Sequence, residues 1–293
     1  MGRDLAADFA VARRTFEEAD ESLSFKLSTL CFDGPPETLA LTEHAQPAIL
    51  VTSVAIYRVL AEMTGLVPRV VAGHSLGEWS ALVVANALGL ADAARGVRER
   101  GRQMQRAVPA GAGAMAAVIG LDTPTVTALC EEAAGGDVVA PANLNGGGQV
   151  VVSGHTAAVE RLMRLAVAQQ ARVQRLDVSA PFHCPLMAPA ADGVARFLAD
   201  VEVREPAVPV VTSVEGRPVT SRADVVSLLV SQVTAPVRWE DTMAALRAFA
   251  PTRAFEVGPG RVLCGLARRL WPELPCQPVG DRASVERAAE ALR

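Results

Sequence analysis

The chain has 293 residues, 50% of them hydrophobic, so it can bury a large core as one domain or as one domain that carries a smaller insertion. Its formal net charge is −4, 4% of its residues are aromatic and no basic run occurs, which argues against nucleic acid as a partner. The sequence holds no uninterrupted apolar stretch long enough to span a bilayer and no signal peptide, so we expect no membrane contact and a cytoplasmic location.

The first part of the chain reads mainly as helix. Amphipathic patterns predict helices over 5–19 and 47–63, and a short β-branched strand follows over 69–72. Two more helices are expected between Ser75 and about residue 108. A stretch rich in glycine, alanine and proline, 109–113, then predicts a domain boundary.

The middle of the chain has a different order of elements. We predict strands over 115–119, 138–144, 149–153 and 173–178, and helices over 124–134 and 157–169. This βαββαβ order is typical of a ferredoxin-like fold. The sequence therefore predicts a small ferredoxin-like domain over 113–178, inserted into a large domain formed by 1–112 and 179–293.

The last part of the chain resumes the alternation of the large domain. We predict strands over 210–214 and 254–257, and helices over 186–199, 223–232, 239–249, 260–270 and 284–289. Strands that alternate with helices indicate a mainly parallel sheet covered on both faces. The expected fold class is α/β, with an α/β-hydrolase-like parallel sheet in the large domain.

The five cysteines show no paired spacing. An odd number of scattered cysteines without a C-x-x-C pair argues against both a disulfide framework and a zinc site. We expect buried free thiols and no bound metal. The positions are Cys31, Cys130, Cys184, Cys264 and Cys276.

Ser75 lies in a Gly-His-Ser-Leu-Gly sequence, 73–77, between a predicted strand and a predicted helix. In that context a G-x-S-x-G serine sits on a sharp turn and acts as a nucleophile. The following helix directs its first N–H groups and the positive end of its dipole at an oxyanion formed there. The same five letters also occur by chance in glycine-rich loops, so the surrounding pattern carries most of the weight.

A serine nucleophile needs a base, and the chain offers four histidines. His74 adjoins the serine and is expected to point away from it, while His44 and His155 read as ordinary residues at helix starts. His183 lies in a loop that two prolines keep out of regular helix, at the predicted return to the large domain. We therefore expect His183 to be the base, against the alternative of a packed loop histidine.

The base must be oriented through its other ring nitrogen, and no acidic residue is an obvious partner. Asp177 and Glu202 are near in sequence but poorly placed, and a neutral oxygen would also fix the tautomer. Arg100 lies on the second helix after Ser75 between two other arginines. We expect Arg98 and Arg102 to be solvated, whereas a guanidinium that faced the serine would select a carboxylate.

Taken together, these motifs resemble the malonyl-CoA:acyl carrier protein transacylases of fatty-acid synthesis and the acyltransferase domains of polyketide synthases. The resemblance covers nearly the whole chain in order. It rests on Gly73 to Glu78, Arg100-Gly101, Met104-Gln105, Gly113 to Ala116, Asn143, Asn145, Gly148 to Val150, Pro181 to His183 and Glu256 to Gly260.

The resemblance implies a two-step acyl exchange. Ser75 would attack the thioester of malonyl-CoA, and the phosphopantetheine thiol of an acyl carrier protein would then attack the malonyl-serine ester. It implies that His183 is base and then acid, that a main-chain oxygen of Gln232 orients it, and that Arg100 pairs with the malonyl carboxylate. No bound cofactor is implied, and we expect a monomer.

The resemblance also bears on rate and selectivity. Leu76 would supply an oxyanion-hole N–H, and the Phe182 ring would crowd an α-methyl branch, which favours malonyl over methylmalonyl. Family members begin with an apolar strand and a G-Q-G-S-Q-like turn that supplies a second oxyanion donor, and Met1 aligns just after that turn. We expect the natural start to lie upstream; the alternative is a weakened or inactive protein.

Two other functions remain open from the sequence. A serine hydrolase acting on esters or thioesters would share the Ser75 turn, but such enzymes usually place an acidic triad residue between serine and histidine. A non-catalytic scaffold that binds a carrier protein would fit the absent first strand. The sequence leaves open whether the carrier protein serves fatty-acid or polyketide synthesis.

Overall fold

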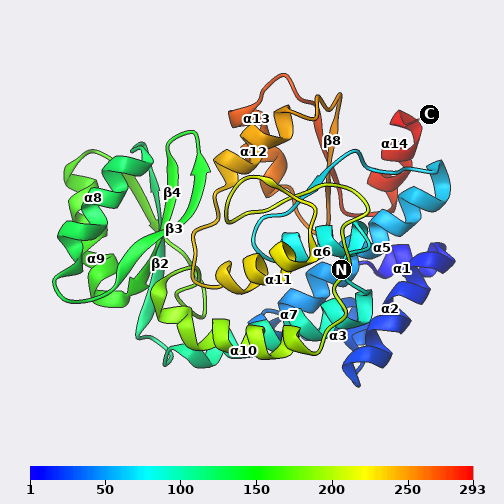
Figure 1. Ribbon diagram of the computed structural model, residues 1–293, viewed down its shortest axis with the longest axis horizontal. Helices are drawn as coiled ribbons and strands as arrows, with labels where there is room; N and C mark the ends of the chain where they lie inside the picture. The colour runs from blue at the N-terminus through cyan, green and yellow to red at the C-terminus, as the bar shows by residue number, and fades with distance from the viewer. Residues whose placement is uncertain (293) are drawn as a thin grey trace.

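A computed structural model describes residues 1–292 and shows a mixed α/β protein (Figure 1). The helices are α1 Arg3–Asp8, α2 Ala10–Leu23, α3 Leu27–Asp33, α4 Pro36–Leu39, α5 Thr42–Thr64, α6 Leu76–Val84, α7 Leu90–Ala107, α8 Thr123–Ala134, α9 Thr156–Ala168, α10 Ala188–Ala199, α11 Arg222–Ser231, α12 Trp239–Arg247, α13 Val262–Leu270 and α14 Arg282–Ala291. The strands are β1 Val71–Ala72, β2 Gly113–Ile119, β3 Val139–Gly146, β4 Gln149–His155, β5 Arg172–Arg175, β6 Val210–Val211, β7 Pro218–Val219, β8 Ala254–Val257 and β9 Cys276–Val279.

A four-stranded antiparallel sheet with α8 and α9 packed on one face lies at one end of the molecule (Figure 1). Its strand order is β3-β4-β2-β5, and its core includes Val118, Val152 and Leu162. The opposite face of this sheet packs against Phe182, the residue before His183. The elements predicted here are confirmed, although β5 ends at Arg175, earlier than expected.

The one mainly parallel sheet expected in the rest of the chain is not confirmed, because its strands lie in two separate sheets. β1 pairs in parallel with β6, which pairs in antiparallel with β7, and β8 pairs in parallel with β9 as a separate sheet. Within residues 1–292, β1 and β8 are not paired with each other, and a groove of about 480 Å³ is lined by both strands and by α5, α6 and α12. Local patterns locate strands, but which strands pair depends on distant contacts.

Two helix predictions are corrected by the structure. The helix expected over 5–19 is broken at Phe9, whose extended backbone separates α1 from α2. The helix expected over 47–63 begins at Thr42 and accommodates Pro47 within its early turns. Among the described residues, α5 is the one helix that is long and apolar enough to cross a membrane. Its most apolar stretch is 61% buried inside the protein, as in a central core helix.

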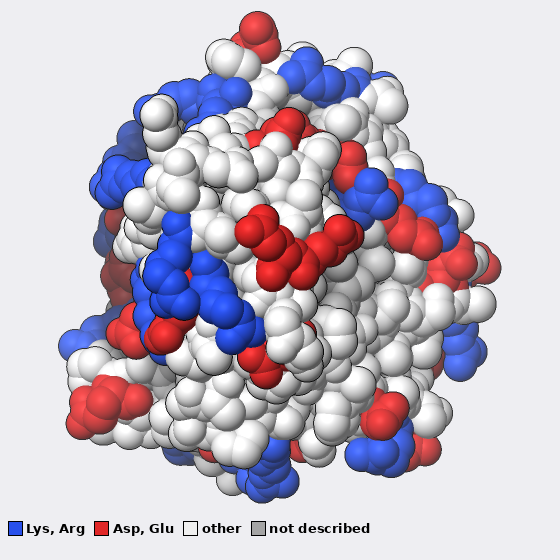
Figure 2. Space-filling view, turned by 90° about the vertical axis from the view of Figure 1, so that its left-hand side faces the viewer, with Lys and Arg blue, Asp and Glu red and all other residues white. Residues whose placement is uncertain are grey.

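The main core lies around α5, where Leu50, Val54 and Ile56 are shielded from solvent. It packs α5 against α2 and α7, and it also buries Trp79 of α6. The surface at the end that holds α8 and α9 carries acidic and basic residues interspersed among uncharged ones (Figure 2). The core thus fixes α6 and α7, the two helices that carry Ser75's neighbours and Arg100.

Candidate active site

Ser75 occupies a tight turn between β1 and α6. Its φ of 51° and ψ of −108° lie outside the helical and extended regions, a strained conformation for a residue with a Cβ. Gly73 makes the turn possible, since a Cβ there would lie 1.9 Å from the carbonyl carbon of Gly77. The turn therefore holds the serine hydroxyl at a fixed place in front of the α6 N-terminus.

The structure brings His183 to Ser75. The distance from Ser75 Oγ to His183 Nε2 is 2.7 Å, and His183 is 4% exposed. Its Nδ1 lies 2.9 Å from the main-chain oxygen of Gln232 and 3.2 Å from that of Ala235. Because carbonyl oxygens only accept hydrogen bonds, Nδ1 carries the proton and Nε2 offers its lone pair to the serine hydroxyl.

His183 is held neutral by its surroundings. Burial, and then the nearby charge of Arg100, lower the pKa of His183 to about 3, while the two carbonyl contacts act in the opposite direction. An imidazole with a lowered pKa is unprotonated at neutral pH and can accept a proton. The site thus holds a hydroxyl and a free base in direct contact.

Arg100 lies on α7 with 2% of its surface exposed. Its guanidinium donates hydrogen bonds to Gln46 Oε1 at 2.7 Å, to Ser75 Oγ at 3.0 Å and to Gln232 Oε1 at 3.1 Å. Its buried Nε has no partner among the described residues. Burial lowers the pKa of Arg100 to about 10, so the side chain stays charged at neutral pH and retains a donor beside the serine.

The close contact of α7 with α5 places this arginine. A Cβ on Gly101 would lie 2.6 Å from the main-chain oxygen of Thr42, so only glycine allows the two helices to approach so nearly. The neighbouring Arg100 is therefore carried into the interior and not to the surface. Its contact with Gln46 of α5 comes from the same approach.

Glu78 is a buried residue of the site that sequence reasoning did not select. Its Oε2 accepts hydrogen bonds from Gln232 Nε2 at 2.8 Å, from Ser213 N at 2.9 Å and from Ser213 Oγ at 2.6 Å. Burial raises the pKa of Glu78, and these hydrogen bonds oppose the increase. The only available signal was its place in the first turn of the helix after Ser75.

Two candidates stand beside the reacting pair. Leu76 is the first residue of α6, and in residues 1–292 its amide has no intrachain acceptor, as is usual for the first N–H groups of a helix. Phe182 is half-buried and packs against the main core as well as the four-stranded sheet. The arrangement can activate a hydroxyl, donate to an oxyanion and neutralise a carboxylate near the reacting atom.

Comparisons with known proteins identify the family. An acyl transferase domain model matches residues 1–269. A malonyl CoA-acyl carrier protein transacylase of Escherichia coli K12 is 44% identical over 99% of this chain and 94% of its own length. The chain belongs to this transacylase family. The transacylase of Bacillus subtilis 168 is 42% identical over 100% of this chain and 93% of its own length.

Solved structures of transacylases share the fold. That of Coxiella burnetii has a TM-score of 0.96 and 38% identity, covering 100% of this chain and 93% of its own. A malonyl-transacylase in complex with its type II PKS acyl-carrier protein has a TM-score of 0.96 and 43% identity, covering 99% of this chain and 94% of its own. The mixed α/β fold with several sheets is therefore that of the family.

The remaining histidines of this transacylase family member lie in other surroundings. His74 is buried, contacts Asn145 Oδ1 through Nε2 at 3.1 Å and packs beside the Trp239 ring. His44 packs against Phe25, and His155 Nδ1 accepts a hydrogen bond from the Val138 amide. None of these three has a hydrogen bond to Ser75 in the described residues.

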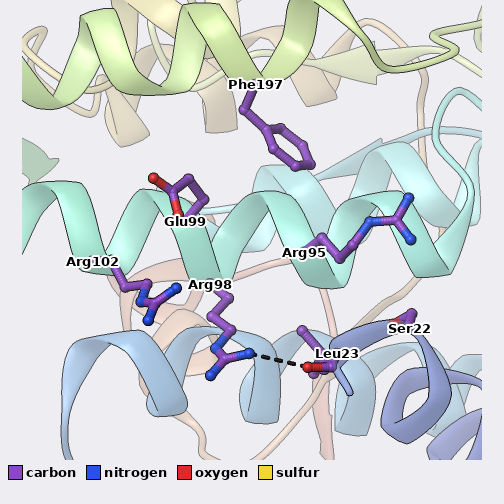
Figure 3. Close-up of a pocket in the computed structure, with 7 residues that line it drawn as sticks. All are labelled: Ser22, Leu23, Arg95, Arg98, Glu99, Arg102 and Phe197. Carbon is purple, nitrogen blue, oxygen red and sulfur yellow. Dashed lines mark hydrogen bonds between the residues drawn. The ribbon is translucent and has the colours of Figure 1, made fainter. Parts of the chain in front are cut away.

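The two arginines that flank Arg100 face another way. Arg98 and Arg102 line a separate cavity of about 260 Å³ between α7, α2 and α10 (Figure 3). Arg98 donates to the main-chain oxygen of Leu23 and stacks on Phe25, and Arg102 pairs with Glu43. The expectation of a solvated Arg98 is thus only partly met, since its side chain packs on the protein, whereas Arg102 lies at the surface.

Proposed function

We propose that this protein transfers a malonyl group from malonyl-CoA to the phosphopantetheine thiol of an acyl carrier protein. The observation that carries the proposal is the buried Arg100 beside Ser75, with a 3.0 Å contact to Oγ and an Nε that has no partner within residues 1–292. A buried cation near the nucleophile favours an acyl group that ends in a carboxylate. The names of the relatives support the same reaction.

The proposed mechanism uses Ser75 as nucleophile and His183 as base. Ser75 Oγ attacks the thioester carbonyl while its proton passes to His183 Nε2, 2.7 Å away. The imidazolium returns the proton to the departing CoA sulfur, and the malonyl-serine ester remains. The carrier-protein thiol then gives its proton to His183, attacks the ester and regenerates the Ser75 hydroxyl.

Four further roles complete the proposed site. The Leu76 amide donates to the oxyanion, and the Gln232 main-chain oxygen holds the His183 ring and stabilises its charged form. Arg100 binds the malonyl carboxylate, and the Phe182 ring leaves little room for an α-methyl branch. All of these steps are carried by the protein and its two substrates, with no bound cofactor, and we place the reaction in the cytoplasm.

We also propose the domain division that this chemistry uses. Residues 1–112 and 179–293 form a large α/β-hydrolase-like domain, and 113–178 form a ferredoxin-like small domain. The order β3-β4-β2-β5 with two helices on one face supports the small domain, and its separate apolar core supports its boundary. The reacting side chains come from the large domain, and the sheet of the small domain packs against Phe182 beside them.

The test follows the acyl group. Incubation with radiolabelled malonyl-CoA should label the protein through Ser75, and a phosphopantetheinylated carrier protein should discharge the label. A Ser75→Ala protein that accumulates the same label would overturn the mechanism. Discharge by water as fast as by the carrier protein would instead identify a hydrolase.

A further inference from the structure

Two cysteines far from the reacting serine lie against each other. Cys264 in the first turn of α13 and Cys276 at the start of β9 have their Sγ atoms 2.9 Å apart. Both are free thiols. The other three cysteines, Cys31, Cys130 and Cys184, are buried at separate places in the fold.

Rigid elements hold the pair in register. Cys276 lies opposite Ala254 in the parallel pairing of β9 with β8. The carboxylate of Glu256, also on β8, accepts hydrogen bonds from the amides of Leu263 at 2.9 Å and Cys264 at 2.7 Å. The same strand therefore fixes both sulfur-bearing segments, and a small side-chain movement would bring the sulfurs to the roughly 2.05 Å of a disulfide bond.

A small oxidant has a route to this pair. Cys276 is half-buried, so its sulfur is the one of the pair that a small oxidant in solvent reaches first. Cys264 is 7% exposed and lies behind it. Neither thiol contacts the Ser75 and His183 site, so their chemistry is separate from acyl transfer.

We propose that Cys264 and Cys276 form a thiol redox site that closes to a reversible disulfide in the presence of a peroxide. The Cys276 sulfur attacks one peroxide oxygen, which releases water and leaves a sulfenic acid. The Cys264 sulfur then attacks the Cys276 sulfur and releases a second water. The two thiols lose two protons and two electrons, and one hydrogen peroxide takes up both.

The two steps of disulfide formation are limited by different properties of the thiols. Burial raises the pKa of both thiols, so little thiolate is present at neutral pH; the contact between them raises the pKa of Cys264 further and partly lowers that of Cys276. The first step is therefore slow. The second step is confined to this pair because the partner sulfur is already in contact.

The direct test is peptide mapping of the oxidised full-length protein. Reduced protein is treated with hydrogen peroxide at pH 9, where more thiolate forms, then alkylated and digested with trypsin without reduction. We expect alkylatable thiols to fall from five to three, and peptides 262–268 and 270–282 to appear as one cross-linked species two hydrogens lighter than their sum. Dithiothreitol should release both peptides.

Matched serine variants assign the chemistry. Cys264→Ser should keep all four of its remaining thiols out of any disulfide, and Cys130→Ser, which removes a buried thiol in a different core, should still give the 262–268 and 270–282 cross-link. A disulfide between any other pair of peptides would overturn the proposal. So would full alkylation of the native protein under conditions that oxidise glutathione in the same tube.

Discussion

Replacing Arg100 with alanine tests the proposed selectivity most directly. The guanidinium is 2% exposed, so a malonyl carboxylate paired with it would be held away from water. Removing one partner of a buried pair of opposite charges costs about 3–5 kcal/mol. Since each 1.36 kcal/mol is tenfold in rate, kcat/KM for malonyl-CoA should fall by roughly 10²–10⁴.

Acetyl-CoA should respond differently to the same change. It lacks the carboxylate, so Arg100→Ala removes from acetyl transfer mainly the charge-assisted hydrogen bond to Ser75 Oγ, a contact worth about 1.5–3 kcal/mol. The preference for malonyl over acetyl should therefore fall by roughly tenfold. The assay is kcat/KM for transfer of each labelled acyl group to the carrier protein.

Arg102→Ala is the matched control for this experiment. Arg102 lies two positions further along α7, with 41% of its side chain exposed and a partner in Glu43. A surface pair contributes about 0–1 kcal/mol, so this variant should keep its selectivity. If Arg100→Ala keeps the malonyl to acetyl ratio of the unmodified protein while remaining folded, the carboxylate is bound elsewhere and the reasoning fails.

Three further changes probe the same site. Since the pKa of His183 is lowered to about 3 in the unliganded protein, this base stays unprotonated as the pH falls from 8 to about 5, and the pH profile of malonyl loading at limiting malonyl-CoA should be flat there; a limb near 6.5 would contradict it. Glu78→Gln removes a buried carboxylate that offsets the charge of Arg100 and should lower the free energy of unfolding by about 3 kcal/mol, measured by urea titration; an unchanged value would show that this carboxyl is neutral in the folded protein. Phe182→Ala should raise kcat/KM for methylmalonyl-CoA relative to malonyl-CoA, and an unchanged ratio would remove the ring from the selection.

The elements that could be predicted from sequence are those that neighbouring residues decide. The βαββαβ run was located closely because β2 and β4 are short apolar runs bounded by turn residues, and because apolar residues recur at helical spacing in α8 and α9. The break at Phe9 was missed because the spacing of apolar residues stays helical through it, although the backbone of Phe9 is extended. β9 was missed because Pro278 and mostly half-exposed side chains obscure a four-residue strand.

The site was predictable only in part, for a related reason. Ser75 and His183 were selected because a strained turn and a proline-bounded loop leave local marks in the sequence. Gln46 leaves none, since its importance comes from its contact with buried Arg100, which depends on how closely α5 approaches α7, and Glu78 leaves only its place in the first turn of α6. His183 is oriented by a main-chain oxygen in place of an acidic side chain. Every residue carries such an oxygen, so the amino-acid composition does not reveal which one is used.

We expect the position of Arg100 to couple the proposed selectivity to the strength of the proposed base. Its charge is the second cause, after burial, of the lowered pKa of His183. A malonyl carboxylate that pairs with Arg100 would cancel much of that charge, so the pKa of His183 should rise and the imidazole should accept the serine proton more readily. An acetyl group would leave the charge in place, and its attack would start from a weaker base.

This coupling can be measured without turnover. In a Ser75→Ala protein labelled with ¹⁵N histidine, the His183 ring should titrate at a higher pH with malonyl-CoA bound than with acetyl-CoA bound. Because the folded-state pKa begins near 3, the difference should be sought between about pH 4 and 6, where unliganded His183 is neutral. Equal midpoints with the two ligands would show that Arg100 selects the substrate by binding alone and does not tune the base.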